Sequence, residues 1–431
     1  TITVKSKLDN SITESITFEV IDNTGIINNL KDIAQEVIDS LPNVVTDKLS
    51  LIFFKDGVQI RYSSSDENLI NVAGIVSPGR GDRLVTFTVK VSVAGFEHEA
   101  SKDLIVKGYE LKDISNRKLT FTYLYTNTGF NQGDLNHIDV INLSFGGIVN
   151  NRVSTTELHT KGSRQIISDA HKAGVRVVLA IGGWGVNGFS EAIETPQTRA
   201  TFIKSIIDVI KEQKYDGIDL DWEYPTRRYN PATGGLEPSG FPNDKQNYTK
   251  FIQELRVEMD KIDEDLILSL AVPASVGAVT NYYEMGKINS SVDFLHIMSY
   301  DLIGYVPGEM TNHHTNIFTN SKSDGGADAS IKAYINAGLD KHKIIVGAAF
   351  YGHAFYNISQ GSSNGYWVNS SLKAADKGTI SYRDIKRLYL DNPDQYTVYY
   401  DEQAIATWLY GNNTFISFDD EVSIAAKAQY V

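Results

Sequence analysis

Short apolar segments alternate with amphipathic helical segments from Lys118 onward, and this alternation is what most limits the fold. Apolar strands that recur roughly every 30–50 residues, with helices between them, are typical of parallel βα units. Polar residues gather where these strands end, which favours a (β/α)8 TIM barrel over an open doubly wound sheet. No glycine-rich phosphate motif follows the first strand, so a nucleotide-binding fold is not predicted. The predicted strands are Leu119–Leu124, Val140–Phe145, Val175–Gly182, Gly217–Glu223, Leu266–Val272, Phe294–Tyr300 and Ile344–Phe350.

The alternation breaks near residue 356. Residues 356–411 are rich in Tyr, Ser, Asn and Gly, and we interpret them as an α+β insertion domain. One more strand, Thr414–Asp420, and a helix, Glu421–Val431, follow before the sequence stops. The predicted fold class is therefore α/β, a TIM barrel with an α+β insertion domain and with its last strand missing.

Residues 1–110 follow a different pattern, in which short strands are separated by turn residues. A hairpin joins Leu84–Val93 to Phe96–Val106, and the whole pattern predicts a β-sandwich. The segment Tyr62–Asp66 and the closing hairpin resemble bacterial immunoglobulin-like modules. Apolar residues at helical spacing also predict a helix at Ile26–Leu41. The predicted domains are this module at 1–110, a polar linker at 111–117 and the barrel at 118–431.

The composition excludes several classes of function. The net charge of −13 disfavours nucleic acids and anionic membranes as partners, because like charges repel. The sequence has no cysteine, which rules out disulfides, thiolate metal sites and a cysteine nucleophile. No apolar run approaches the roughly 20 residues that a membrane helix needs, so we predict no membrane insertion.

The stretch Asp216–Pro225 places three carboxylates on one face of a predicted strand. Side chains alternate along a strand, so Asp219, Asp221 and Glu223 share one face, while Asp216 precedes the strand. Carboxylates in a row repel one another, so some must be protonated, hydrogen-bonded to each other or neutralised by a ligand. Stability alone does not require such a row. It indicates acid–base chemistry or a metal site.

Two other interpretations compete with acid–base chemistry. One is a solvated edge strand with an accidental acidic face, but flanking helices place this strand inside an α/β sheet. The other is a metal site, although the segment lacks the glycine that an EF-hand calcium loop requires at its turn. The pair His313 and His314 also suggests a metal, but adjacent side chains point apart. We predict no metal and no cofactor.

The same residues resemble the signature motifs of glycoside hydrolase family 18, the chitinases. Asp216–Glu223 is similar to the pattern D-x-x-D-x-D-x-E, and Ala180–Trp184 resembles the S-x-G-G motif with Ala in place of Ser. Met298–Asp301 resembles M-x-Y-D, and Phe350–His353 resembles Y-G-R with His in place of Arg. The motifs occur in the family's order, and the resemblance covers residues 118–431. The insertion is similar to that of deep-cleft chitinases, and family 18 endo-N-acetylglucosaminidases usually lack it.

The resemblance implies a role for each motif residue. Glu223 would be the general acid and base, and Asp221 would orient the substrate's 2-acetamido group, whose oxygen acts as the nucleophile. Tyr300 would hydrogen-bond that oxygen, and Trp184 at the barrel mouth would stack on a sugar. Like charges close together also predict a raised pKa for the acid. The expected catalytic residues are Glu223, Asp221, Asp219 and Tyr300, and the expected substrate-binding residues are Asp216, Gly183, Trp184, Tyr224, Met298, Asp301 and Tyr351.

The implied function is retaining hydrolysis, endo- or exo-acting, of β-1,4 bonds between N-acetylglucosamine units in chitin or its oligosaccharides. The alternatives are an endo-N-acetylglucosaminidase acting on N-glycans and a non-catalytic, chitin-binding, lectin-like protein. We expect an extracellular bacterial monomer, secreted or on the cell surface, since a first residue other than Met suggests trimming. In the family a further strand closes the barrel, so activity of these 431 residues depends on what fills that gap.

Overall fold

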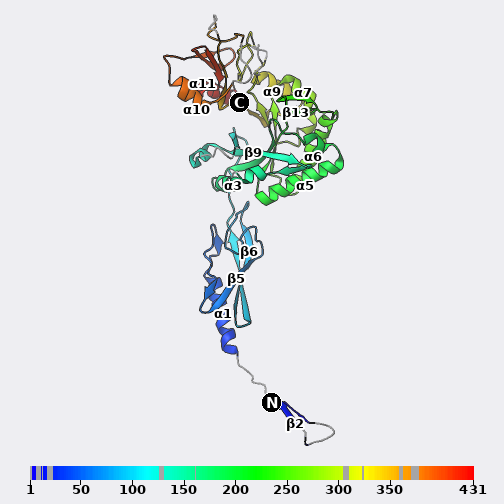
Figure 1. The fold of residues 1–431 in the computed structure, drawn as a ribbon, viewed down its shortest axis with the longest axis vertical. Coiled ribbons are helices and arrows are strands. Elements are labelled where there is room, and N and C mark those ends of the chain that lie inside the picture. Colours follow the sequence, from blue (N-terminus) through cyan, green and yellow to red (C-terminus); the bar gives the residue numbers. More distant parts are fainter. Residues whose placement is uncertain are drawn as a thin grey trace. The chain divides into compact units, whose positions relative to one another are not determined.

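The chain folds into two compact units, Thr1–Glu110 and Leu111–Val431, in a computed structural model (Figure 1). Each unit has a hydrophobic core of its own. The structure describes residues 2–5, 11, 13–16, 23–125, 131–160, 162–303, 310–322, 325–358, 363–369 and 378–431.

A five-stranded sheet and one helix make up most of the first unit. The sheet has the order β3-β7-β6-β5-β4, with β3 parallel to β7 and the other pairs antiparallel. Helix α1 (Thr24–Asp39) buries Leu30, Ile33 and Val37 in the same core as Phe87 and Val89 of β6. The strands are β1 (Ile2–Lys5), β2 (Thr13–Ile16), β3 (Val44–Val45), β4 (Phe54–Lys55), β5 (Val58–Ser64), β6 (Arg83–Val93) and β7 (Phe96–Val106).

The β-sandwich predicted for residues 1–110 is not confirmed by the part of this unit that the structure describes. Residues in β5 and β6 alternate between buried and exposed, so this sheet has one apolar face. That face is covered by α1, which is the helix predicted at Ile26–Leu41. Because the helix already buries the apolar face, no second sheet is needed to cover it.

Seven parallel strands form a curled sheet in the second unit, in the order β8-β9-β11-β12-β15-β16-β17. The short strand β10 (Arg152–Ser154) pairs antiparallel with β9. β11 and β12 are buried along their whole length, as expected for strands covered on both faces. The parallel strands are β8 (Phe121–Tyr125), β9 (Val140–Val149), β11 (Arg176–Gly182), β12 (Gly217–Asp221), β15 (Ile267–Pro273), β16 (Phe294–Met298) and β17 (Ile344–Val346).

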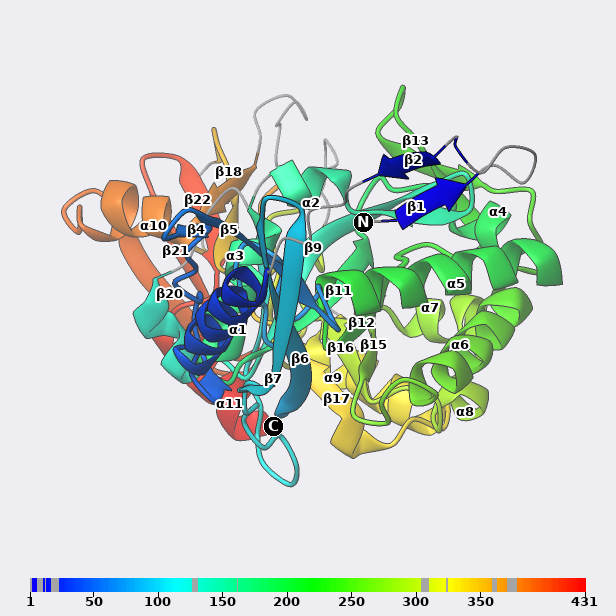
Figure 2. The same ribbon diagram turned by 90° about the horizontal axis from the view of Figure 1, so that it is seen from below.

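Helices connect the parallel strands and pack outside the curled sheet, as α5 and α6 do side by side in Figure 2. Helix α5 begins as its sequence predicts, because Thr195 Oγ1 accepts the N–H of Thr198 at 3.1 Å and Pro196 occupies the first helical position. The helices are α2 (Thr156–Thr160), α3 (Ser163–Lys172), α4 (Phe189–Ile193), α5 (Pro196–Gln213), α6 (Asp244–Asp260), α7 (Val276–Tyr282), α8 (Met285–Ile288) and α9 (Ala327–Asn336), with 3-10 turns η1 (Gln132–His137) and η2 (Lys341–Lys343). A hairpin of β13 (Arg227–Asn230) and β14 (Gly235–Pro238) follows β12.

The curled sheet is a TIM-like half-barrel in the described residues, with β8 and β17 as its unjoined edges. The strand predicted at Ile344–Phe350 ends early, at Val346. Phe350 is 75% exposed and leads directly into another sheet, which explains why the apolar run in the sequence is longer than the strand.

A second, antiparallel sheet follows, in the order β19-β18-β22-β21-β20 (orange to red in Figure 1). It starts at β18, before the predicted insertion at 356–411, and Thr414–Asp420, predicted as one more strand, contributes β22 to it. The subdomain therefore spans a longer stretch than its composition suggested. Its elements are β18 (Tyr351–Phe355), β19 (Thr379–Ser381), α10 (Tyr382–Ile385), the π-helical turn η4 (Lys386–Leu390), β20 (Thr397–Asp401), β21 (Ala406–Gly411) and β22 (Thr414–Phe418), followed by α11 (Glu421–Tyr430).

Residues 111–117, predicted as a linker, are packed onto the second unit. Lys112 Nζ donates hydrogen bonds to the carbonyl oxygens of Leu135 and Ile138 at 2.7 and 2.8 Å. Arg117 forms an ion pair with Asp139 at 2.6 Å. This segment thus belongs to the second unit. Among the described residues, no helix combines the length and the apolar character that crossing a membrane requires.

Candidate active site

The carboxylate row predicted from the sequence lies at the carboxyl edge of the curled sheet. β12 ends at Asp221, and Glu223 follows in the loop, so the row starts on the strand and finishes beyond it. Asp219 is fully buried, Asp221 is 5% exposed, and Glu223 is half-buried. Exposure increases along the row, so Glu223 is the member that a substrate can reach most easily.

Asp219 is held by two hydroxyl groups from other strands of the curled sheet, Tyr123 on β8 and Ser269 on β15. Tyr123 donates to Oδ2 at 2.8 Å, and Ser269 donates to Oδ1 at 2.7 Å. Burial raises the pKa of Asp219 to about 6, although both hydrogen bonds oppose the shift. The Nε2 atom of His296 lies 3.8 Å from Oδ1, and burial lowers the pKa of this imidazole to about 3, which keeps it neutral.

Asp221 lies between the other two carboxylates and has little solvation of its own. Its Oδ1 atom is buried without a hydrogen-bond partner among the described residues. Burial, followed by the negative charges of Glu223 and Asp219, raises the pKa of Asp221 well above its ordinary value. A proton is therefore retained within the row near neutral pH.

Glu223 has the pKa that a general acid needs. Burial raises the pKa of Glu223 to about 7, and the negative charge of Asp301 adds to the shift. A carboxyl group with this pKa can donate a proton near neutrality and accept one back as a carboxylate. The arrangement can thus perform acid–base chemistry on a bond placed above it.

Tyr300 follows β16 and lies near the same carboxylates. Burial and the charge of Asp221 raise the pKa of Tyr300, so the phenol keeps its proton and can donate a hydrogen bond. Its ring packs edge-on against Tyr351, with centroids 6.0 Å apart. Met298 is the half-buried last residue of β16 and precedes Tyr300 by two positions.

Asp301 adopts a left-handed backbone conformation, with φ of 55°, at the exposed side of the cluster. Its Oδ2 accepts the hydroxyl of Tyr351 at 2.7 Å, and its Oδ1 lies 2.6 Å from Nε2 of His353. The ring of His353 stacks on His314, with centroids 4.3 Å apart. Burial lowers the pKa of His314 well below its ordinary value, so this imidazole is neutral.

Trp184 is the large exposed aromatic side chain beside the row. It follows β11 and is 58% exposed, and its ring packs edge-on against Tyr224 and Tyr229. Tyr224 itself is buried, and its hydroxyl donates to the carbonyl oxygen of Val186 at 2.9 Å. Trp184 therefore offers a face to a ligand, whereas Tyr224, predicted to bind substrate, supports that ring from behind.

Gly183 has a backbone role. Its N–H donates to the carbonyl oxygen of Asp221 at 2.9 Å, and its φ is 88°. A Cβ at this position would lie 3.2 Å from the ring of Phe145, so a side chain would disturb the close approach of these strands. This backbone hydrogen bond fixes the end of β12, and substrate binding by Gly183 stays a prediction.

Asp216 is not brought to the cluster. It precedes β12, and its Oδ2 accepts hydrogen bonds from His171 Nε2 at 2.7 Å and from the N–H of Val177 at 2.8 Å. The whole length of β12, about 16 Å at the usual rise per residue, separates Asp216 from the end of the row. The structure thus places Asp216 away from the carboxylates to which the sequence assigned it, and Asp216 joins α3 to the start of β11.

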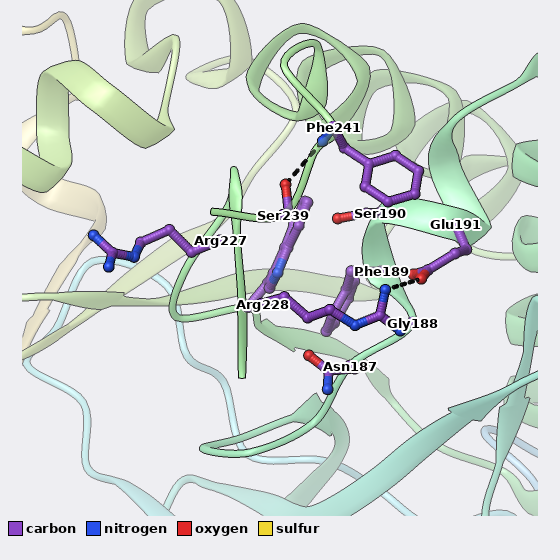
Figure 3. Close-up of a pocket in the computed structure, with 10 residues that line it drawn as sticks. Asn187, Gly188, Phe189, Ser190, Glu191, Arg227, Arg228, Ser239 and Phe241 are labelled. Atoms are coloured by element: carbon purple, nitrogen blue, oxygen red, sulfur yellow. Dashed lines mark hydrogen bonds and ion pairs between the residues drawn. The ribbon is translucent and has the colours of Figure 1, made fainter. Parts of the chain in front are cut away.

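A small pocket is lined by Phe189, Trp222, Arg228 and neighbouring residues (Figure 3). Trp222 stacks on Phe189 with centroids 5.1 Å apart. At the rim, Arg228 pairs with Glu191 at 2.8 Å. None of the predicted site residues lines this pocket.

Sequence reasoning missed Tyr123, Ser269, His296 and His314 as neighbours of the row. A signal was present for two of them, because Ser269 and His296 are polar residues within otherwise apolar predicted strands. Ser269 lies directly opposite Asp219 in the β12–β15 pairing. The positions of Tyr123 and His314 depend on contacts across the fold, which spacing along the chain does not reveal.

Enzymes with a TIM barrel carry their catalytic residues at the carboxyl ends of the parallel strands, which is where this chain carries its buried carboxylates. The fold and the site together thus indicate an enzyme of this class. A family model described as "Glycosyl hydrolases family 18" matches residues 115–431. Because the match covers most of the sequence, the chain belongs to this family.

Individual relatives are distant. Chitinase A1 of Niallia circulans is 31% identical over 276 residues, which are 60% of this chain and 38% of that protein. Chitotriosidase-1 of Mus musculus is 28% identical over 308 residues, 67% of this chain and 62% of that protein. A family 18 N-acetylglucosaminidase structure from Paenibacillus barengoltzii is 28% identical, with a TM-score of 0.64, and the match covers 73% of this chain and 91% of that chain. The chain thus spans less than two thirds of these two curated relatives.

Proposed function

We propose that the chain is a chitinase that hydrolyses β-1,4 bonds between N-acetylglucosamine units. The observation that carries the proposal is a half-buried Glu223, with its pKa raised to about 7, at the end of a row of protonated or hydrogen-bonded carboxylates. Family membership and the relatives named as chitinases support the same substrate class.

In the first step, Glu223 donates its proton to the glycosidic oxygen as the bond to C1 breaks. The 2-acetamido oxygen of the sugar attacks C1 and forms an oxazolinium ion, so no enzyme nucleophile is needed. Asp221 accepts a hydrogen bond from the acetamido N–H and stabilises the positive charge. Tyr300, whose phenol stays protonated, donates to the acetamido oxygen and holds it at C1.

In the second step, water replaces the departed sugar. The Glu223 carboxylate accepts a proton from this water, whose oxygen attacks C1 and reopens the oxazolinium ring. Two displacements at C1 give net retention of configuration. Asp219, fixed by Tyr123 and Ser269, positions Asp221 through both steps without contacting the sugar.

The surrounding residues supply binding surface in this proposal. Trp184 stacks on a sugar ring through its exposed face. Asp301 accepts hydrogen bonds from hydroxyl groups of the neighbouring sugar, and Tyr351, which donates to Asp301, accepts one as well. The first unit, Thr1–Glu110, serves as a spacer or as a contact to the polysaccharide surface. We propose that the enzyme acts outside the cell as a monomer.

The test is hydrolysis of soluble chitin oligosaccharides, with the anomeric form of the fresh product followed by proton NMR. We expect the β-anomer first, and we expect Glu223→Gln to lower kcat by about 10²–10⁴ while retaining binding of the oligosaccharide. An α-anomer as first product, or a variant as active as the parent, would contradict the mechanism. Binding without any hydrolysis by the parent would instead favour the lectin-like alternative.

A second candidate follows from the similarity to the N-acetylglucosaminidase from Paenibacillus barengoltzii, whose match covers 91% of that chain. Such an enzyme would release single N-acetylglucosamine units. The product distribution from a pentamer distinguishes the two activities, because a chitinase yields mainly dimers and trimers at early times.

A further inference from the structure

Two histidines and one aspartate converge at the side of the carboxylate row, from three separate segments of the chain. Asp301 follows β16, His353 lies on β18, and His314 lies in the connection between them. One ligand atom of each residue lies within 4.8 Å of those of the other two. Both histidine side chains are buried, while 54% of the Asp301 side chain is exposed.

The distances between the ligand atoms of these residues lie on either side of the ligand–ligand distance in a zinc site. His353 Nε2 lies 2.6 Å from Asp301 Oδ1, and His314 Nδ1 lies 3.9 Å from the same oxygen. Ligands bound to zinc at about 2.1 Å in tetrahedral geometry are about 3.4 Å apart, which falls between these values. Small side-chain shifts would therefore place all three atoms around one ion.

The surroundings hold the imidazoles in place. The backbone N–H of His314 donates to Ser417 Oγ at 3.0 Å, and the His314 ring stacks on His353 with an interplanar angle of 12°. His314 Nδ1 is the ring nitrogen that faces Asp301, and it accepts the backbone N–H of Asp301 at 3.4 Å. This contact keeps Nδ1 directed toward the other two ligand atoms, and a metal ion would take its place.

The charge nearby is compatible with a cation. Lys427 is a buried positive group in this region, but its Nζ is paired with Asp419 Oδ2 at 2.6 Å. Tyr351 donates to the second oxygen of Asp301 at 2.7 Å, which would orient a carboxylate ligand. The three ligands together carry one negative charge when the histidines are neutral.

We propose that Asp301, His314 and His353 bind a divalent transition-metal ion beside the carboxylate row. Two imidazoles and one carboxylate suit Zn²⁺, Ni²⁺ or Cu²⁺, whereas Mg²⁺ and Ca²⁺ require more oxygen ligands. Three protein ligands leave at least one position for water or for a sugar hydroxyl.

The ion regulates hydrolysis, an effect that rests on the proposed function. A bound cation occupies the Asp301 carboxylate, which then no longer accepts hydrogen bonds from the substrate. Zn²⁺ therefore inhibits the enzyme.

The test measures metal binding without substrate, so that its outcome does not depend on chitinase activity. Chelator-treated protein is titrated with CoCl₂, whose visible absorption reports nitrogen and oxygen ligands, and with ZnCl₂ in a calorimeter. We expect one equivalent bound, with the affinity lowered at least about tenfold in Asp301→Asn and in His353→Gln. The control is His342→Gln, an exposed histidine outside the cluster, which should bind as the parent does.

Two results would overturn the proposal: no Zn²⁺ or Co²⁺ binding by the parent at about 0.1 mM metal, or unchanged binding in both variants. If His353→Gln proves unfolded, the result for Asp301→Asn alone tests the proposal. The Asp301 side chain is mostly exposed, so its substitution should not prevent folding. Inhibition of hydrolysis by ZnCl₂ is measured separately. Binding without inhibition would leave the site in place and remove only its regulatory effect.

Discussion

Glu223 is exposed enough to meet a substrate and buried enough to keep its proton near neutral pH. Burial and the charge of Asp301 raise its pKa to about 7. Because the first step needs the protonated form, kcat/KM should fall about tenfold per pH unit above this value. The pH dependence of kcat/KM with a chitin oligosaccharide measures this decline, and Asp301→Asn should move the decline to lower pH. A decline at the same pH in the variant and the parent would contradict this assignment.

Asp221 illustrates how the site lowers stability for the sake of function. Its pKa is raised in the folded state above the ordinary 3.8, so the native protein binds the proton more tightly than the unfolded chain does. Stability from this group is therefore present below pH 3.8 and is lost as the pH rises through the folded pKa. The buried carboxyl group favours folding less at high pH than at low pH.

We expect Asp221→Asn to be inactive but more stable at pH 8, by about 1 kcal/mol, with the difference shrinking toward pH 4. Urea unfolding at both pH values measures this. The control is Asp265→Asn at an exposed position, which should show no such dependence. A loss of stability in Asp221→Asn at pH 8 would show that its carboxylate is better solvated than its surroundings indicate.

At the scale of elements, α11 is joined to both sheets of the second unit by one buried cation. Lys427 Nζ contacts Asp419 Oδ2 and Thr315 Oγ1, both at 2.6 Å, and lies 3.4 Å from the carbonyl oxygen of Gly347. Burial lowers the pKa of Lys427, and the ion pair with Asp419 opposes that shift. The helix is thus fixed to the end of β22 and to the residue after β17.

Lys427→Met should destabilise the second unit by about 3–5 kcal/mol, because it leaves the buried Asp419 carboxylate without its counter-charge. The double variant Lys427→Met/Asp419→Asn should recover much of this loss, since it removes both charges. Denaturant unfolding of the parent and the two variants measures the difference. Equal stability of the single and double variants would mean that the remaining hydrogen bonds to Asp419 suffice.

The elements of the second unit were largely predictable, because apolar runs and helix caps are local signals. The carboxylate row was found for the same reason, since alternation along β12 places Asp219 and Asp221 on one face. The end of β17 was not predictable, because the apolar run continues to the exposed Phe350. The β-sandwich predicted for the first unit is not confirmed, because strand spacing along the sequence does not show that a helix covers the sheet.

The sequence predicted those site residues that lie close together along one strand, but not those that meet only in the folded chain. Asp216 belongs to the same motif as Glu223, but the length of the strand places it at the opposite edge of the sheet. The contact between Asp301 and His353 links the loop after β16 to β18, and no local pattern indicates it. Such pairs are set by the way distant segments of the chain meet in the fold.

At the scale of the whole molecule, the net charge of −13 has little influence on a neutral substrate. N-acetylated chitin oligosaccharides carry no charge, so kcat/KM should change less than about twofold between 50 and 500 mM NaCl. Partly deacetylated chitosan is cationic and provides the control. Its binding should weaken clearly over the same range. A strong salt dependence with the neutral oligosaccharide would point to an exposed charge in the catalytic step.

The pairing of Asp219 with Ser269 across β12 and β15 links folding to activity. A shift of β12 by one residue would exchange the two faces of the strand. Ile218 and Leu220 would then face the inside of the curled sheet, and the carboxylates would face the apolar layer under α5 and α6. A misaligned molecule could not bury its core, so it would remain unfolded and be open to proteolysis. Only molecules with the correct β12 register can therefore fold, and in those molecules the catalytic row is correctly placed. We expect the active fraction of a preparation to equal its folded fraction.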